Sequence, residues 1–251
     1  MKKEEYKRIF EQEENYWWYL GMRKISEVLL DSVIKSPSLK ILDAGCGTGG
    51  MMFFLKKFGN VSGIDISPEA LKYCQKRGLK QIKESSIEKI LFNDEKFDLV
   101  TSFDVLYHQW VKNDFLVIRE FYRVLKPGGY LLMRVPAYNW LRGKHDEVIK
   151  TRHRYTKNEL VQKVRLSGFK ILRSTYANTI LFPIALLKRS SERFLPEGKT
   201  SDIKPLPKII NTLFTKILYF EGRIITKFSL PFGLSLFVLA QKPINQQSSR
   251  E

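Results

Sequence analysis

The chain has 251 residues, of which 43% are hydrophobic and 13% aromatic, and its formal net charge is +17. These fractions supply enough apolar surface for a packed core and exclude global disorder. The two cysteines, Cys46 and Cys74, are too few for a disulfide framework and lack the C-x2-C spacing of a metal site, so they fit a reducing compartment.

The positive charge is concentrated in the second half of the chain. Residues 140–233 contain 19 basic and 7 acidic side chains, whereas residues 1–139 contain 22 and 18. A basic region of this kind attracts phosphates, nucleic acid or an anionic membrane surface. A lysine-rich surface that only keeps a protein in solution has the same composition, so charge alone leaves both interpretations open.

Residues 1–36 predict a helical N-terminal extension with an aromatic cluster, NYWWYLG. The first residues, MKKEEYKRIFEQEEN, lack the apolar segment of a signal peptide, and no run of about 18 apolar residues occurs. We therefore expect a cytoplasmic protein without a spanning helix. Trp17 and Trp18 could form a lid over a binding site, or they could only dock the first helix on the sheet.

From residue 39 onward, short apolar runs alternate with helical periods. The second of these helices has clear boundary signals, because Ser67 suits the N-cap, Pro68 the first turn and Gly78 the end. Strands that alternate with helices indicate parallel pairing and right-handed crossovers. The predicted strands cover 39–45, 61–67, 79–84, 97–104 and 128–136, and the predicted helices cover 48–59, 67–78 and 111–125.

The pattern is less regular beyond residue 156. A helix is predicted over 156–169, where Thr156 and Glu159 have capping-box spacing. Strands are predicted over 169–177 and 233–242. The residues between these strands are apolar and basic, contain five prolines and predict an insertion of two or three amphipathic helices.

These elements together predict an α/β protein with a Rossmann-like, doubly wound, mostly parallel sheet of seven strands and helices on both faces. The expected core comprises residues 37–177 and 233–243. The extension at 1–36 precedes it, the basic amphipathic insertion at 178–232 interrupts it, and a flexible tail at 244–251 follows it.

The strongest chemical signal is the segment DAGCGTG, which begins at Asp43, ends the first predicted strand and opens a helix. Doubly wound folds bind nucleotides at this position. Gly45 and Gly47 permit a sharp turn and close approach of a ligand, because no Cβ intrudes. Asp65 ends the second strand, where a carboxylate can accept hydrogen bonds from both hydroxyls of a ribose. A purely structural glycine turn is the alternative.

The order D-x-G-x-G-x-G discriminates between nucleotides. A dinucleotide loop reads G-x-G-x-x-G and directs helix N–H groups at a pyrophosphate. An acid before the first glycine would repel a pyrophosphate but suits an ammonium group. The loop therefore favours S-adenosylmethionine, which carries a sulfonium and an amino group and no phosphate, over NAD.

At this point the chain resembles the class I S-adenosylmethionine-dependent methyltransferases. The resemblance covers residues 39–136, where ILDAGCGTGG, VSGIDIS, ESSIEKILF, FDLVTSFDVLYH and FYRVLKPGGYLLMRVP stand in the family's order and spacing. It implies the family's fold, in which the last strand is antiparallel, and S-adenosylmethionine as cofactor. More loosely, YWW…GMRK and HD…RHRYT…LPFGLSL are similar to a branch associated with cell-surface glycan or lipid assembly.

The resemblance also implies the cofactor contacts. The glycine loop would line the methionine end, Asp65 would hold the ribose and Ile66 would pack on the adenine. Ser85 stands where many relatives have an acid that holds the adenine amino group, and Tyr107–His108 where many have Glu-His. The expected cofactor residues are Arg23, Asp43, Gly45, Cys46, Gly47, Gly49, Asp65, Ile66, Ser86, Ile87, Phe103 and Asp104.

Candidate acceptor residues follow the fourth and fifth strands, because the ligand crevice of a doubly wound sheet lies at the carboxyl ends of its strands. His108 could act as a base or only pack, and His145 with Asp146 could form a base with an orienting acid. The RHRY stretch could bind a phosphate or carboxylate, or form a solvated charged loop. The candidate substrate contacts are Trp17, Trp18, Tyr107, His153, Arg154 and Tyr155.

No metal is expected, because His145 and His153 are eight residues apart and no third ligand accompanies them. Methyl transfer from a sulfonium needs mainly alignment of nucleophile, methyl and sulfur, so a catalytic base is optional.

The leading interpretation is a methyltransferase that acts on a small-molecule, glycan or lipid-linked acceptor of anionic character, with possible contact to the inner membrane face. The alternatives are an RNA methyltransferase, an NAD-dependent oxidoreductase and a non-catalytic cofactor-binding scaffold. Nucleic acid is less favoured, because SFDVLY replaces the Asn/Asp-Pro-Pro-aromatic segment of base-amine methyltransferases.

Overall fold

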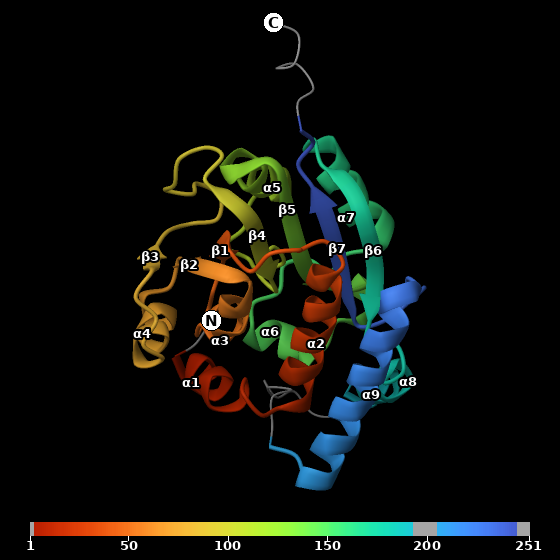
Figure 1. The fold of residues 1–251 in the computed structure, drawn as a ribbon. Coiled ribbons are helices and arrows are strands. Elements are labelled where there is room, and N and C mark those ends of the chain that lie inside the picture. Colours follow the sequence, from red (N-terminus) through yellow and green to blue (C-terminus); the bar gives the residue numbers. More distant parts are fainter. Residues whose placement is uncertain (1–2, 193–204, 245–251) are drawn as a thin grey trace, which may run out of the picture.

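The computed structural model describes residues 3–192 and 205–244. They form a seven-stranded sheet of order β3-β2-β1-β4-β5-β7-β6, in which only β7 runs antiparallel to its neighbours (Figure 1). The predicted fold is therefore confirmed. The strands are β1 (Leu39–Ala44), β2 (Gly59–Asp65), β3 (Ile82–Glu84), β4 (Phe97–Phe103), β5 (Leu125–Pro136), β6 (Lys170–Ala177) and β7 (Ser235–Gln241).

Alternation along the strands builds a hydrophobic core on each face of the sheet. In β1, Ile41 packs on one face and Leu42 on the other, as successive side chains of a strand must. One face is covered by α5 (Asp114–Val124) and α7 (Lys157–Leu166). The opposite face is covered by α2 (Trp17–Asp31), α3 (Gly50–Leu55), α4 (Pro68–Lys76) and α9 (Lys208–Lys227).

Local capping fixes where several helices begin. The Ser67 hydroxyl accepts a hydrogen bond from the Ala70 amide at the start of α4, as predicted. Thr156 accepts from the Glu159 amide at the start of α7. The Glu159 carboxylate does not complete the capping box, because His153 Nε2 lies 2.8 Å from one of its oxygens.

The insertion between β6 and β7 contributes α8 (Phe182–Glu192) and α9, and residues 193–204 lie outside the described part. The buried carboxylate of Glu221 on α9 accepts the backbone N–H groups of Asn178, Thr179 and Ile180. This contact fixes the start of α8 to α9, and α9 in turn packs along α2 (Figure 1). The domain boundaries remain a prediction, and nearly all of the predicted tail, residues 245–251, lies outside the described residues.

The remaining elements are short or terminal. They are α1 (Lys3–Gln12), the 3-10 turns η1 (Lys56–Phe58) and η2 (Asn139–Leu141), and α6 (Lys144–Val148), which falls in a stretch where no helix was predicted. Among the described residues, no helix is both long and apolar enough to cross a membrane.

Candidate functional site

A cavity of about 670 Å³ opens at the carboxyl ends of the strands. One half is lined by the glycine loop and the ends of β2 and β4. The other half is lined by segments that are far apart in the sequence, namely the start of α2, the end of β5, α6, α8 and the N-terminal part of α9. The predicted crevice is present, and its two halves have different origins along the chain.

The glycine loop has the geometry that its sequence requires. Gly45 and Gly47 have φ of +84° and +55°, in the left-handed region that favours glycine. A Cβ on Gly47 would meet no atom within 4 Å, so its backbone is open to the cavity. Gly49 also has positive φ, but it does not line the cavity, and a Cβ there would collide with Leu79. Gly49 therefore packs at the start of α3, and its predicted contact with the cofactor remains a prediction.

Asp43 has one occupied and one unoccupied oxygen. Its Oδ1 accepts a hydrogen bond of 2.8 Å from the Thr101 hydroxyl, whereas Oδ2 is buried and has no partner within the described residues. Burial raises the pKa of Asp43 to about 7. A buried carboxylate oxygen without a donor fits an ammonium group, because such a ligand would supply the missing hydrogen bond and lower the pKa.

Asp65 braces the glycine loop as well as facing the cavity. Its carboxylate accepts the backbone N–H of Gly47 at 2.9 Å and that of Ser67 at 2.9 Å. Burial raises the pKa of Asp65, and these amide donors act in the opposite direction. Each oxygen keeps a second lone pair for a ribose hydroxyl. The expected contacts Cys46, Ile66, Ser86, Ile87, Phe103 and Asp104 also line the cavity.

The N-terminal extension closes this half of the cavity through a buried acid that sequence reasoning missed. The Glu13 carboxylate accepts hydrogen bonds from the Thr48 hydroxyl and from Arg77 at 2.7 Å. Burial raises the pKa of Glu13. Arg23 donates to the Glu13 carbonyl, and its Nη2 would lie 3.0 Å from a Cβ on Gly50. Arg23 is therefore placed beside the glycine loop, where its Nε has no partner in the described chain.

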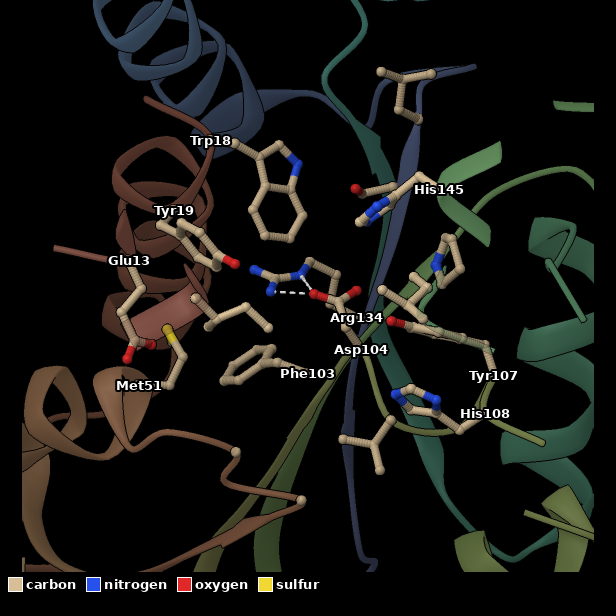
Figure 2. Close-up of a pocket in the computed structure, with 18 of the residues that line it drawn as sticks. Glu13, Trp18, Tyr19, Met51, Phe103, Asp104, Tyr107, His108, Arg134 and His145 are labelled. Carbon is tan, nitrogen blue, oxygen red and sulfur yellow. Dashed lines mark hydrogen bonds and ion pairs between the residues drawn. The ribbon is translucent and has the colours of Figure 1, made fainter. Parts of the chain in front are cut away.

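A second missed residue, Arg134, lies at the junction of the two halves. Its guanidinium is 4% exposed, donates from Nε to the Asp104 carboxylate at 2.9 Å and lies 4.7 Å from the Trp18 ring centre. Figure 2 shows Arg134 between Trp18 and Tyr19 on one side and Tyr107 on the other. Nη1 is buried and has no hydrogen-bond partner among the described residues.

A sequence signal for Arg134 existed. It is the only charged side chain in the apolar run YLLMRVP of β5, and an arginine in a buried strand needs a partner. Asp104, which supplies that partner, has φ of +57°, an uncommon value for a residue with a side chain. The turn after β4 therefore holds the carboxylate against Arg134.

Of the predicted base candidates, His108 is the better defined. Burial lowers the pKa of His108 to about 4, so the imidazole is neutral near pH 7. Its ring stacks on Tyr107 at 4.6 Å, and its Nδ1 is buried without a partner in the described residues. His108 therefore lines the cavity with a neutral imidazole whose Nδ1 is available for a hydrogen bond to a ligand.

His145 lines the cavity, but Asp146 does not act as its isolated partner. Both Asp146 oxygens lie 2.9 Å from Nη1 of Arg154, and one also accepts the Gly143 amide. Arg154 donates in addition to the Ala137 carbonyl, and both charged side chains are buried. The pair forms an internal brace of the acceptor half, so neither group has the exposure expected of a solvated charged loop.

His153 and Tyr155, the two predicted substrate contacts that flank Arg154, lie outside the cavity lining. His153 contacts Glu159 and Asn139, outside the residues that line the cavity. Tyr155 is fully buried, and its hydroxyl donates to Asp114 at 3.0 Å. Trp17 and Trp18 do line the cavity, and the Trp17 ring also packs on Phe214 of α9 at 5.2 Å. Both tryptophans therefore line the cavity, and Trp17 also docks α2 against α9.

Unpartnered polar atoms mark the cavity as a binding site. Seven buried side-chain nitrogens or oxygens in the described chain lack a hydrogen-bond partner, and six of them belong to residues that line this cavity. Such atoms are costly unless a ligand or water satisfies them. The six residues are Trp17, Arg23, Asp43, His108, Arg134 and Asn178. No cluster of three or more metal-ligating side chains occurs in residues 3–192 and 205–244.

Known proteins match this architecture. A methyltransferase domain family matches residues 42–133. The chain is 31% identical to the uncharacterized protein MJ1123 of Methanocaldococcus jannaschii, in an alignment that covers 60% of this chain and 76% of that protein. It is 30% identical to phosphoethanolamine N-methyltransferase 3 of Arabidopsis thaliana, over 45% of this chain and 24% of the plant enzyme. The chain thus spans about a quarter of the plant enzyme's length.

A solved S-adenosylmethionine-dependent methyltransferase from Methanosarcina mazei has the same fold, with a TM-score of 0.56, 21% identity, and coverage of 86% of this chain and 97% of that chain. The chain belongs to the class I S-adenosylmethionine-dependent methyltransferases. Its cofactor is S-adenosylmethionine, which fits the acid-first glycine loop and the unpartnered Oδ2 of Asp43.

Proposed function

We propose that this methyltransferase acts on an anionic small-molecule, glycan or lipid-linked acceptor, and that Arg134 binds the anion. The observation that supports this proposal is the buried Nη1 of Arg134, which has no partner in the described residues and belongs to a side chain that lines the cavity. Because Asp104 already holds the Arg134 guanidinium in place, little side-chain conformational entropy is lost when a second charged group binds to it.

The charges around Arg134 favour an anion over a cation. Among the described residues that line the acceptor half, the basic side chains are those of Arg134, Arg154, Lys188 and Arg189, and the carboxylates are those of Asp104 and Asp146. The Arabidopsis relative is named for phosphoethanolamine, an acceptor with a phosphate group.

The cofactor carboxylate has a different candidate partner. Arg23 stands next to the start of α3, beside the glycine loop whose acid is Asp43. We assign Arg23 to the carboxylate of the methionine moiety and Arg134 to the acceptor. Asp65 would hold the ribose, and Ile66, Ser86 and Ile87 would surround the adenine.

Bound S-adenosylmethionine supplies a methyl group on a positively charged sulfur. The aromatic rings of Trp18 and Phe103, which lie 4.7 Å and 5.2 Å from the Arg134 guanidinium carbon, would keep water from this part of the cavity. His108 Nδ1 would accept a hydrogen bond from the nucleophile and orient it. Alignment of this kind is the main requirement for an in-line transfer.

The test is transfer of a radiolabelled methyl group from S-adenosylmethionine into extract of the source cell, separated into small-molecule, lipid, glycan, RNA and protein pools. We expect label in the small-molecule, lipid or glycan pool, on material that binds an anion-exchange resin before methylation. Label confined to RNA would replace this proposal with the nucleic-acid alternative. Retained cofactor binding without label in any pool would support the non-catalytic scaffold.

A further inference from the structure

Exposed apolar side chains are concentrated in the insertion. Of 21 large hydrophobic side chains exposed in the described chain, 11 lie in residues 180–192 and 205–232, which make up less than a fifth of it. Leu187 on α8 is 72% exposed and Ile209 on α9 is 83% exposed. A concentration of this kind on a folded surface indicates an interaction site.

Aromatic contacts make the part around α8 continuous. The Phe182 ring at the start of α8 lies 6.2 Å from Trp140 and 5.4 Å from Phe232. Trp140 is 54% exposed and Phe232 is 43% exposed, so this cluster reaches the surface. Ile184 and Leu187 follow along α8. We call the surface formed by Trp140, Ile180, Ile184, Leu187 and Phe232 the α8 rim.

The outer face of α9 adds charge to this apolar surface. Helical spacing of three and four residues places six exposed side chains on one face. Three are apolar and three are basic, and the only acid of the helix, Glu221, is buried on the other side. The three basic side chains form no ion pair with any residue of the described ranges. The face consists of Ile209, Leu213, Lys216, Phe220, Arg223 and Lys227.

We infer that the α8 rim and the outer face of α9 together dock on an anionic phospholipid bilayer. The large apolar side chains of both surfaces enter the interfacial layer, and the lysines and the arginine on the outer face of α9 contact anionic headgroups. Each basic residue near such a surface strengthens binding about fivefold. The charge complementarity favours anionic lipid over a second copy of this strongly basic chain.

The placement of α8 connects this surface to the cavity. Leu181, Ala185 and Ile184 of the α8 segment line the cavity, and Ile184 also belongs to the α8 rim. Docking would therefore bring the acceptor half close to the bilayer, where a lipid-held acceptor could enter. This inference goes beyond the proposed methyl transfer, and it can be tested without any acceptor.

The test is flotation of the full-length protein with vesicles of phosphatidylcholine alone or mixed with phosphatidylglycerol. We expect binding to the mixed vesicles that weakens as salt is raised, because exposed charges are screened. The double variant Lys216→Glu/Arg223→Glu should reduce partition to the mixed vesicles more than about tenfold. Its matched control is Lys80→Glu/Lys83→Glu, which reverses two exposed charges near β3 at the far edge of the sheet.

The apolar contribution has its own pair of variants. Leu187→Ser/Phe220→Ser should also lose vesicle binding, whereas Phe53→Ser/Leu166→Ser, equally exposed on α3 and α7, should retain it. S-adenosylhomocysteine titration shows that each variant is folded, since none of these residues lines the cavity. Equal vesicle binding by surface and control variants would overturn the inference. So would retention on RNA with no binding to anionic vesicles.

Discussion

The two halves of the cavity differ in how the chain builds them. The cofactor half comes from residues 43–48, 65–66 and 85–87, each at or just after the end of one strand, and the N-terminal extension closes it through Glu13. The acceptor half combines the start of α2, the end of β5, α6 and a two-helix insertion. The first half is the one that resembles other methyltransferases in sequence. Most of the second half lies outside the matched residues 42–133, so we expect it to determine the acceptor.

The largest expected effect concerns the division of work between the two arginines. Arg134→Met should lower kcat/KM for methyl transfer by about a thousandfold, as for loss of a buried charged contact in the transition state. Affinity for S-adenosylhomocysteine, measured by calorimetric titration, should stay within about twofold. Arg23→Met should weaken that affinity instead. If Arg134→Met abolishes cofactor binding, Arg134 belongs to the cofactor half and the anionic-acceptor proposal fails.

The second prediction concerns the Asp146–Arg154 pair as a brace of the acceptor half. Asp146→Ala leaves the Arg154 guanidinium buried and unpaired, so the free energy of unfolding should fall by about 3 kcal/mol. Urea denaturation measures this change. Exchange of the exposed Glu147, the next residue on α6, should change it by less than about 0.5 kcal/mol. An unchanged stability with lost turnover would point to a direct catalytic role for Asp146.

The third prediction tests the ribose contact in the cofactor half. Asp65→Ala should weaken cofactor binding by about 1 to 3 kcal/mol, because it removes charged hydrogen bonds to the ligand. Part of this loss would come from the glycine loop, since Asp65 also accepts the Gly47 amide. Asp65→Asn, which keeps an oxygen acceptor, should lose less. Unchanged affinity in Asp65→Ala would refute the ribose assignment.

The smallest expected effect is a pH dependence that originates at Asp43. Burial raises the pKa of Asp43 to about 7, and an ammonium group binds the ionised carboxylate. Cofactor affinity should therefore rise nearly tenfold between about pH 6 and about pH 7.5. Asp43→Asn should bind weakly and show no such rise. Calorimetric titration across this range is the measurement.

The raised pKa of Asp43 has the opposite effect on stability, because it makes the free energy of unfolding fall as pH rises. The folded chain keeps on Asp43 a proton that the unfolded chain releases from about pH 4 upward, so this contribution to stability declines as pH rises toward 7. Asp43→Asn removes the decline and should be more stable than the wild type above pH 7. If the wild type and Asp43→Asn have the same free energy of unfolding at all pH values, the pKa of Asp43 is close to its usual range.

The sequence predicted more of the cofactor half than of the acceptor half for a physical reason. Asp43, Gly45 and Gly47 are a few residues apart, and the positive φ of the glycines follows from their residue type. By contrast, Asp146 was expected to orient His145, and its carboxylate is instead bound by Arg154. Whether a charged side chain faces a cavity or an internal partner depends on contacts between segments, which spacing does not reveal.

By itself, the sequence determined the order of strands and helices along residues 39–136, the doubly wound sheet and the position of the nucleotide loop, because alternating apolar patterns and glycine-rich turns act locally. Only the tertiary structure decided that Arg134 lines the cavity beside Asp104, and that the Glu13 carboxylate binds Thr48 of the glycine loop. It also decided that α8 both lines the cavity and exposes an apolar rim. These features join residues more than 25 positions apart, and packing alone brings them together.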